Sequence, residues 1–169
     1  MGSDIVYVPQ DNVTLAILKE AKEIEHHLHN EEIWIGNGVS EDSLTGYQLT
    51  SGNNDFGSEV LLLDTVNTPI RTGKLFFDLH RLFVTAISSA TPYLIRLIYG
   101  TGTVGDAETA KQYTTVPVTS AGVGSNLKGA PSDVLFDRVA AGTKVWAKCK
   151  NVTNLSTISV LIGLHEYAE

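Results

Sequence analysis

The sequence predicts a mainly β protein, a jelly-roll-like antiparallel β-sandwich preceded by an N-terminal arm and one α-helix. Three observations indicate this class. The longest run of β-branched, aromatic and aliphatic residues, Leu75 to Gly100, is typical of a hairpin of two strands joined at Ser88 to Pro92. Shorter runs of the same kind recur after residue 32, separated by turn-forming segments. A long helix-forming stretch without Gly or Pro occurs at Thr14 to Asn30.

Size and charge narrow the possible functions. At 169 residues, the chain is long enough for one domain with an appendage and for a core that needs no disulfide or metal. Twelve basic and nineteen acidic side chains give a net charge of −7, so nucleic acid and anionic membrane surfaces would on average be repelled. We therefore expect neither a nucleic-acid partner nor a membrane partner.

The single cysteine and the first residues indicate the compartment. Cys149 has no partner for an internal disulfide, and its alternation with Val145 and Ala147 predicts a small buried side chain. The first ten residues have neither the basic nor the apolar region of a signal peptide, and no run approaches the roughly 18 apolar residues of a membrane span. We expect synthesis in a reducing cytoplasm, without an export signal.

An arm and a helix are predicted for the first 32 residues. Residues 1–11 are too few for a domain, and residues 12–32 are expected to form a helix with Asn12 as its N-cap. Two interpretations of the helix stay open: a seam between the subunits of a trimer, or an amphipathic helix that lies against the β domain. Both use apolar positions that are spaced three and four apart, namely Thr14, Ile17, Ala21, Ile24 and Leu28.

Residues 33–169 are predicted to form one β-sandwich domain. Two long loops, Thr101 to Gln112 and Thr119 to Ser132, are where contacts to a partner are expected. The expected strands are Ile33 to Ile35, Tyr47 to Leu49, Glu59 to Leu63, the two strands of the 75–100 hairpin, Tyr113 to Val118, Val134 to Phe136, Thr143 to Cys149 and Thr157 to Leu164.

Alternation within the strands predicts which side chains enter the core. Strand position also predicts that Trp34 and Trp146 are buried. The expected apolar faces are Tyr93, Ile95, Leu97 and Tyr99; Phe77, Leu79, Phe83, Thr85 and Ile87, interrupted by Arg81; and Ile158, Val160, Ile162 and Leu164.

Three histidines on the predicted helix, His26, His27 and His29, lie near Glu23 and Glu25. Two of them share a face, but a closed metal site needs four ligands and a supporting shell of hydrogen bonds. We therefore predict a solvated helix face and no metal. In a trimer, His27 would flank the seam and would be a candidate pH-sensitive group.

Asp78, His80 and Arg81 interrupt an apolar strand, with the first two expected on one face and Arg81 on the other. Polar residues in such a strand need partners, so a buried or interfacial network is predicted. We expect Arg81 to pair with a carboxylate such as Asp137 or Glu166 at a contact between subunits. His165, Glu166 and Tyr167 form a second polar edge after the last strand.

Sequence motifs for catalysis are missing. The chain has no G-x-S-x-G elbow, Walker sequence, H-E-x-x-H or C-x-x-C motif, and the glycines from Gly100 to Gly105 are interpreted as a turn. We predict a protein that is not an enzyme and uses no cofactor.

Several motifs occur in one order along the chain: Ile24 to His29 with Trp34 to Gly36 at the helix-to-domain junction, then Phe77 to Arg81, Pro92 to Gly102, Ala141 to Ala147 and Ile162 to Tyr167. Together they resemble a family of small tailed-phage virion proteins. The resemblance extends over roughly residues 17–167.

This resemblance implies a capsid decoration, or cement, protein with a jelly-roll body. Such a protein would bind the outside of the capsid as a homotrimer, clamp neighbouring subunits of the major capsid protein, and be made in the host cytoplasm. The residues expected to contact the capsid are those of the arm, Ile5, Val6, Tyr7 and Val8.

Two alternatives stay open at this point. The first is a trimeric tail-fibre or spike head that binds a host receptor or glycan, although only 13 residues precede the heptad pattern. The second is a small hydrolase or carbohydrate-binding module outside any virion. A pocket with perturbed polar groups would favour the hydrolase, and a row of exposed aromatic residues would favour the binding module.

Overall fold

The computed structural model describes residues 32–37, 45–64, 74–119 and 131–168, all within one structural unit that begins at Glu32. The predicted arm and almost all of the predicted helix lie outside these ranges. So do the proposed seam and the proposed capsid-contact residues. The fold below is therefore that of the β domain alone.

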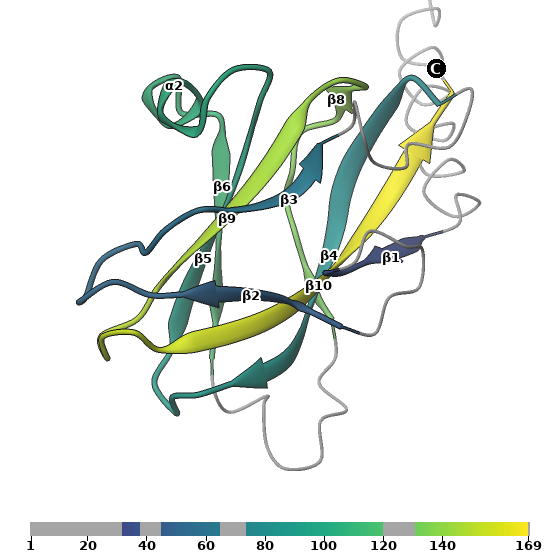
Figure 1. Cartoon of the computed structure of the whole chain (residues 1–169). Helices are drawn as coiled ribbons and strands as arrows, with labels where there is room; N and C mark the ends of the chain where they lie inside the picture. The colour runs from purple at the N-terminus through teal and green to yellow at the C-terminus, as the bar shows by residue number, and fades with distance from the viewer. Residues whose placement is uncertain (1–31, 38–44, 65–73, 120–130, 169) are drawn as a thin grey trace, which may run out of the picture. The chain divides into compact units, whose positions relative to one another are not determined.

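The described residues form two antiparallel sheets and one short helix, so the prediction of a mainly β sandwich is confirmed (Figure 1). The larger sheet has the order β1-β10-β4-β7, with β2 also paired to β10 and β8 to β4. The smaller sheet has the order β3-β9-β5-β6. We call them the six-stranded and the four-stranded sheet.

The elements have the following bounds. In the six-stranded sheet the strands are β1 (Ile33–Ile35), β2 (Tyr47–Thr50), β4 (Phe76–Ile87), β7 (Ser132–Asp133), β8 (Val139–Ala140) and β10 (Thr157–Tyr167). In the four-stranded sheet they are β3 (Val60–Asp64), β5 (Tyr93–Gly100), β6 (Tyr113–Val118) and β9 (Lys144–Lys150), and the helix is α2 (Val104–Thr109).

The inner faces of the two sheets share one hydrophobic core. Alternate residues of the central strands supply it, as the sequence pattern predicts, because successive side chains of a strand point to opposite faces. Burial of each large aliphatic side chain contributes roughly 1.5–3 kcal/mol. The side chains that are fully buried include Ile95 and Leu97 of β5, Val145, Ala147 and Cys149 of β9, and Ile158, Val160, Ile162 and Leu164 of β10.

The predicted hairpin between residues 75 and 100 is wrong. β4 belongs to the six-stranded sheet and β5 to the four-stranded sheet, so the two strands lie across the core from each other and do not pair. The connection, Ser88 to Pro92, has no Gly or Asn to form the tight turn that two-residue hairpins require. It carries the chain from one sheet to the other, where Tyr93 Oη donates a hydrogen bond of 2.9 Å to the Thr157 carbonyl oxygen.

A β-bulge in β4 changes which side chains face the core. Leu79 pairs with Leu164, and Arg81 pairs with Gly163, which leaves His80 as an extra residue in β4. One extra residue reverses the alternation for the rest of the strand.

A second register shift leaves Thr85 as an extra residue in the same way. Between the two bulges, Leu82 and Val84 face the core, and Phe83 does not belong to it. The predicted inward face is therefore correct for Phe77, Leu79 and Ile87, and it is wrong for Phe83 and Thr85.

Two further segments differ from the prediction. The expected strand at Val134 to Phe136 is an irregular segment between β7 and β8, with Val134 buried and Leu135 91% exposed. The expected turn after Gly100 contains α2, whose N-terminus is closed by a capping box between Thr103 and Asp106.

Candidate functional site

The candidate site lies on the outer face of the six-stranded sheet, where β4 and β10 pair. The register places Asp78 opposite His165. The imidazole rings of His80 and His165 stack with their centroids 4.4 Å apart and their planes at 24°. We call Asp78, His80, His165 and Tyr167 the histidine cluster.

Asp78 joins this cluster through both of its carboxylate oxygens. Tyr167 donates a hydrogen bond of 2.7 Å from its hydroxyl to Asp78 Oδ2, and His165 Nδ1 lies 3.8 Å from Asp78 Oδ1. Burial raises the pKa of Tyr167, and the hydrogen bond to Asp78 and its charge raise it further. The tyrosine therefore stays a neutral donor. The predicted polar network at Asp78 and His80 is present.

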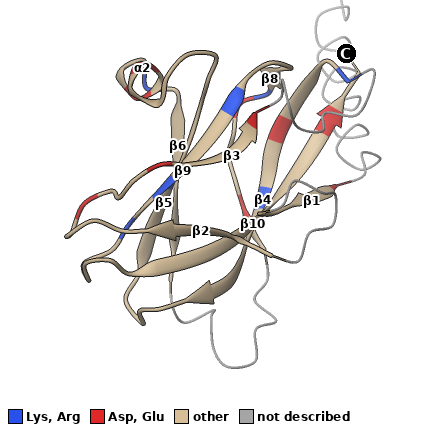
Figure 2. Ribbon diagram, viewed as in Figure 1, with Lys and Arg blue, Asp and Glu red and all other residues tan. Residues whose placement is uncertain are grey.

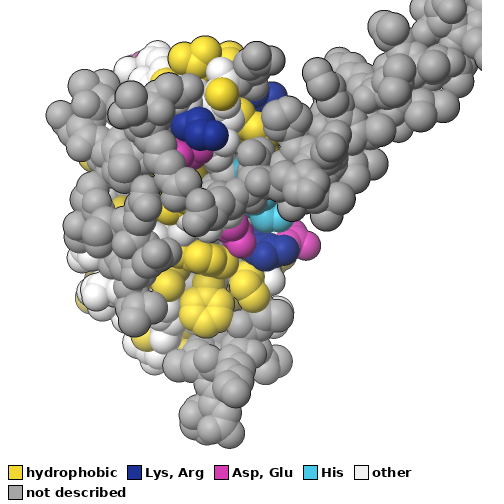
Figure 3. Space-filling model, turned by 90° about the vertical axis from the view of Figure 1, so that its right-hand side faces the viewer, with side chains coloured by type: hydrophobic (Ala, Val, Ile, Leu, Met, Phe, Trp, Pro, Cys, Tyr) yellow, Lys and Arg dark blue, Asp and Glu magenta, His cyan; other side chains and the backbone are white. Residues whose placement is uncertain are grey.

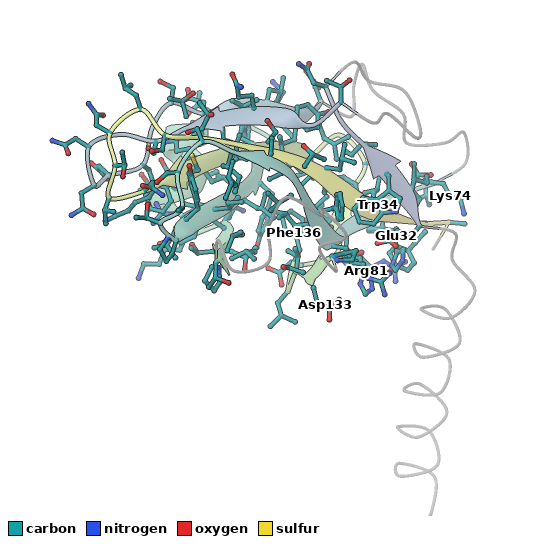
Figure 4. The ribbon with its side chains drawn as sticks, turned by 90° about the horizontal axis from the view of Figure 1, so that it is seen from below. Glu32, Trp34, Lys74, Arg81, Asp133 and Phe136 are labelled. Atoms are coloured by element: carbon teal, nitrogen blue, oxygen red, sulfur yellow. The ribbon has the colours of Figure 1, made fainter. Side chains whose placement is uncertain are left out.

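Arg81 lies on the same outer face as His80, whereas simple alternation places it on the opposite face. The bulge at His80 causes this, because two successive residues of β4 then occupy one position beside β10. Arg81 Nη1 lies 3.1 Å from a carboxylate oxygen of Glu32, and its Nε lies 3.6 Å from Asp133. Figure 4 shows Glu32, Arg81 and Asp133 gathered at one end of the sheet.

Arg81 thus pairs with carboxylates, as predicted, but within the described part of this chain neither Asp137 nor Glu166 is one of them; a contact between subunits stays a prediction. Asp137 accepts a hydrogen bond from the Tyr99 hydroxyl, and the side chain of Glu166 is buried. Burial and the contact with Asp137 raise the pKa of Tyr99 to about 12.

The carboxylate that does pair with Arg81, that of Glu32, lies over Gly163 of β10. A Cβ added to Gly163 would lie 2.3 Å from Glu32 Oε1 and 3.2 Å from Arg81 Cβ, so the flexible Glu32 side chain would have to move.

An aromatic surface adjoins the charged residues. Trp34 of β1 points outward, because Ile33 and Ile35 on either side of it enter the core. Its ring meets Phe83 edge to face, with centroids 6.3 Å apart. The prediction that both tryptophans are buried is thus right for Trp146 and wrong for Trp34, which is half-buried.

On the side of the molecule that carries β1, hydrophobic side chains lie next to basic, acidic and histidine side chains (Figure 3). Tryptophan and arginine are the residue types most enriched among those that dominate binding energy at protein interfaces. We call Trp34, Phe83 and Arg81 the aromatic surface.

Arg138 packs against the histidine cluster from the segment between β7 and β8. Its guanidinium carbon lies 4.3 Å from the ring centroid of Tyr167 and 4.9 Å from that of Phe76. Such cation–π contacts stabilise by about 0.5–2 kcal/mol, depending on how far water is excluded.

A second charged cluster lies on the outer face of the four-stranded sheet, which we call the arginine cluster. Glu108 of α2 accepts hydrogen bonds of 3.0 Å from Arg96 and 2.8 Å from Lys148. The Arg96 guanidinium carbon lies 4.1 Å from the centroid of the Phe56 ring and 4.3 Å from that of Tyr113.

The arginine cluster fixes α2 on its sheet. Burial opposes the ionisation of Glu108, but the hydrogen bonds from Lys148 and Arg96 outweigh it and lower the pKa of this carboxyl. Figure 2 shows where the charged residues occur along the ribbon of both sheets.

The sequence pattern identified part of the histidine cluster. Asp78, His80 and Arg81 were singled out for their position in an apolar strand, and His165 and Tyr167 as a polar edge. Nothing in the spacing showed that the two groups pair. The sequence pattern does not identify four further residues of the site, because their positions depend on a bulge or on contacts between residues distant in sequence. These residues are Glu32, Asp133, Phe83 and Arg138.

The described residues contain no group of three or more His, Cys, Asp or Glu side chains that could hold a metal ion. None of their helices is long and apolar enough to cross a membrane. The His26, His27 and His29 cluster lies outside them, as do the seam positions and the arm.

Comparison with known proteins gives this chain no family. No protein-family model, curated protein or solved structure matches it. The resemblance to phage virion proteins therefore stays a prediction.

Proposed function

We propose that this chain is a non-enzymatic structural protein of a tailed-phage particle, a trimeric decoration protein that binds the outside of the capsid and stabilises it. One observation carries the proposal. Two of the segments that resemble the virion family, Phe77 to Arg81 and Ile162 to Tyr167, are distant in sequence and pair in register as β4 and β10. Together they form the histidine cluster and present Arg81 on the outer face of one sheet.

The proposal includes a jelly-roll body, which the strand order supports. Most successive strands fall in opposite sheets: β2, β4 and β10 in the six-stranded sheet, and β3, β5 and β9 in the four-stranded sheet. Chains that fold as two Greek keys cross between sheets in this way.

The aromatic surface is a suitable contact between subunits. Its side chains are held in place before any partner arrives: Trp34 by Phe83, and Arg81 by Glu32 and Asp133. Surfaces that are ordered in advance lose less conformational entropy on association.

The proposal is tested by the mass of the protein in solution and by its binding to empty capsids of the phage that encodes it. Three chains of 18.2 kDa give a trimer of about 55 kDa by light scattering. We expect a trimer that binds capsids, and we expect binding to be lost when residues 1–11 are removed. The aromatic surface is tested by Trp34→Ser with Phe83→Ser, which should weaken the trimer.

The control is Leu61→Ser, which removes a leucine that is 46% exposed on β3 of the other sheet. It should leave the trimer and capsid binding unchanged. A trimer that does not bind capsids would contradict the decoration role and favour the head of a tail fibre or spike. A monomer would contradict both.

A further inference from the structure

We propose that the aromatic surface binds a second copy of this chain, in a trimer whose subunits meet head to tail. Leu135 of one copy packs on Trp34 and Phe83 of the next copy. Asp133 of the first copy pairs with Arg81 of the second. We call Asp133 and Leu135 the leucine edge. The inference rests on the proposed trimer and names the residues that close it.

A trimer with threefold symmetry needs two different contact patches on each subunit. One patch of a subunit meets the other patch of its neighbour, and the rotation closes the ring. The aromatic surface is the first patch, so the second has to lie elsewhere on the same chain.

One row of residues crosses the outer face of the six-stranded sheet. Trp34 of β1 pairs with Gly163 of β10. Gly163 pairs in turn with Arg81 of β4, and Arg81 pairs with Asp133 of β7. Figure 4 shows Arg81 between Trp34 and Asp133. Trp34 and the leucine edge therefore lie at opposite edges of this sheet, an arrangement that lets one copy follow another around a ring.

The leucine edge is held out from the domain. Leu135 is the most exposed large hydrophobic side chain in the described part of the chain, at 91%. Val134 before it is buried and donates its amide to the His80 carbonyl oxygen at 2.8 Å, and Phe136 after it packs against the core. The side chain of Asp133 is 83% exposed. Alternate side chains of an extended segment point the same way, so a carboxylate and a leucine are presented together.

The two patches match in spacing and in chemistry. Arg81 and Phe83 lie two residues apart on the outer face of β4. The two residues of the leucine edge have the same separation, roughly 7 Å in an extended chain. An incoming carboxylate can therefore meet the guanidinium while the leucine covers the aromatic rings and leaves water.

Arg81 has donors left for such a carboxylate. Among the described residues its side chain makes one hydrogen bond, of 3.1 Å to Glu32, and its Nε lies 3.6 Å from Asp133 of the same chain. A guanidinium has five N–H donors and binds carboxylates best through two of them at once.

Paired cysteines test the contact in the full-length protein. Phe83→Cys and Leu135→Cys are made separately and together, and mild oxidation is followed by denaturing electrophoresis without reducing agent. We expect covalent trimers of about 55 kDa, three chains of 18.2 kDa, from the double variant only. A head-to-tail contact does not bring the same residue of two copies together, so neither single variant should give a covalent dimer.

Two features keep this test specific. Within one chain, Leu135 follows the residue that bonds to the His80 carbonyl oxygen, so it lies at least about 10 Å along β4 from Phe83. A disulfide joins Cα atoms that are no more than roughly 7 Å apart. Cys149 is fully buried, and burial raises the pKa of its thiol to about 11, so the native cysteine stays unreactive.

Light scattering of the unmodified protein separates this inference from the proposed function. If that protein is a trimer and the double variant gives no cross-link, the inference alone is overturned. A covalent dimer from either single variant has the same meaning. If the unmodified protein is a monomer, the proposed function is contradicted, and the inference with it.

A second measurement leaves the aromatic surface unchanged. Leu135→Ser removes a side chain with few contacts in its own domain, so the circular dichroism of the β domain should not change. The dissociation constant of the trimer should rise at least tenfold. Leu155→Ser is the matched control, at a leucine that is 69% exposed between β9 and β10, and it should leave the trimer unchanged. Equal dissociation constants for the two variants would overturn the inference.

Discussion

The two sheets carry charged clusters on their outer faces, and the clusters differ in how tightly their charges are paired. In the arginine cluster, both cations lie within 3.0 Å of one carboxylate, and the side chains of Arg96, Glu108 and Lys148 are 15–25% exposed. On the six-stranded sheet, the shortest ion pair that Arg81 makes is 3.1 Å, and its side chain is 42% exposed.

This difference separates a structural cluster from a candidate functional one. The Glu108 carboxylate that Arg96 and Lys148 share fixes α2 in place. The histidine cluster contains two stacked imidazole rings, next to an aromatic surface that suits a protein partner. Polar residues in an apolar strand therefore indicate function only when their type and exposure are also considered.

The substitution with the largest expected effect disrupts the hydrophobic core, on which both sheets and their clusters depend. Leu97 is fully buried between the sheets, so Leu97→Asp places an unpaired charge in the core. We expect a loss of at least about 3–5 kcal/mol of stability, and therefore no soluble folded protein. Soluble yield and thermal unfolding measure this.

Leu94→Asp is the matched control, on the same strand and 39% exposed. It should change the free energy of unfolding by only about 0.5 kcal/mol. If both variants unfolded alike, the assignment of faces in β5 would be wrong.

Removing one arginine from each sheet tests whether the two clusters differ in their contribution to stability. Arg96→Ala loses the hydrogen bond to Glu108 and the contacts with Phe56 and Tyr113, which together contribute about 2–4 kcal/mol. Arg81→Ala should cost about 1 kcal/mol or less, because its ion pairs are more exposed. Chemical denaturation of both variants gives the two values.

The proposed subunit contact predicts the opposite order for assembly. Arg81→Ala should weaken the trimer, and Arg96→Ala should not. Equal effects of the two substitutions on stability and on assembly would remove the distinction between the clusters.

Local patterns predicted most of the fold, and long-range register decided the rest. In β5, β9 and β10 the alternate positions that the sequence assigns to the core are buried, apart from Tyr99, which is half-buried. In β4 the bulges at His80 and Thr85 reverse the alternation, and no residue in the sequence marks either of them. The missing hairpin has the same origin, because partner choice between β4 and β10 depends on residues far apart in the chain.

The candidate site shows the same limit. Asp78 and His165 were each recognised as polar residues at a strand, but only the register brings them together. By contrast, α2 carries a local signal that the sequence interpretation overlooked: Thr103 followed three residues later by Asp106, the pattern of a capping box.

A smaller effect concerns the acid dependence of the arginine cluster. The pKa of Glu108 is lowered in the folded protein, so its charge stabilises the fold above about pH 4.5. This contribution is lost as the pH falls through the lower, folded-state pKa. Glu108→Gln should cost roughly 1–2 kcal/mol at pH 7, and its difference from the unmodified protein should shrink towards pH 3.

Urea unfolding at pH 7, 5 and 3 tests this. A difference that stays constant across the three values would mean that the ionised form of Glu108 contributes nothing.

The smallest expected effect tests whether the arginine cluster depends on α2. Thr103 accepts a hydrogen bond of 3.2 Å from the Asp106 amide, and its own amide donates to the Asp106 carboxylate. Thr103→Ala removes the side-chain half of this box and should cost about 1 kcal/mol, because a helix of six residues has few other hydrogen bonds to hold its first turn. Thr109→Ala is the control: it deletes a hydroxyl that is bonded to the Gly105 carbonyl on an exposed side, and should have almost no effect. Amide exchange at Ala107 to Gln112 should accelerate only in the first variant, and exchange around His80 and His165 should change in neither, because the two clusters lie on different sheets.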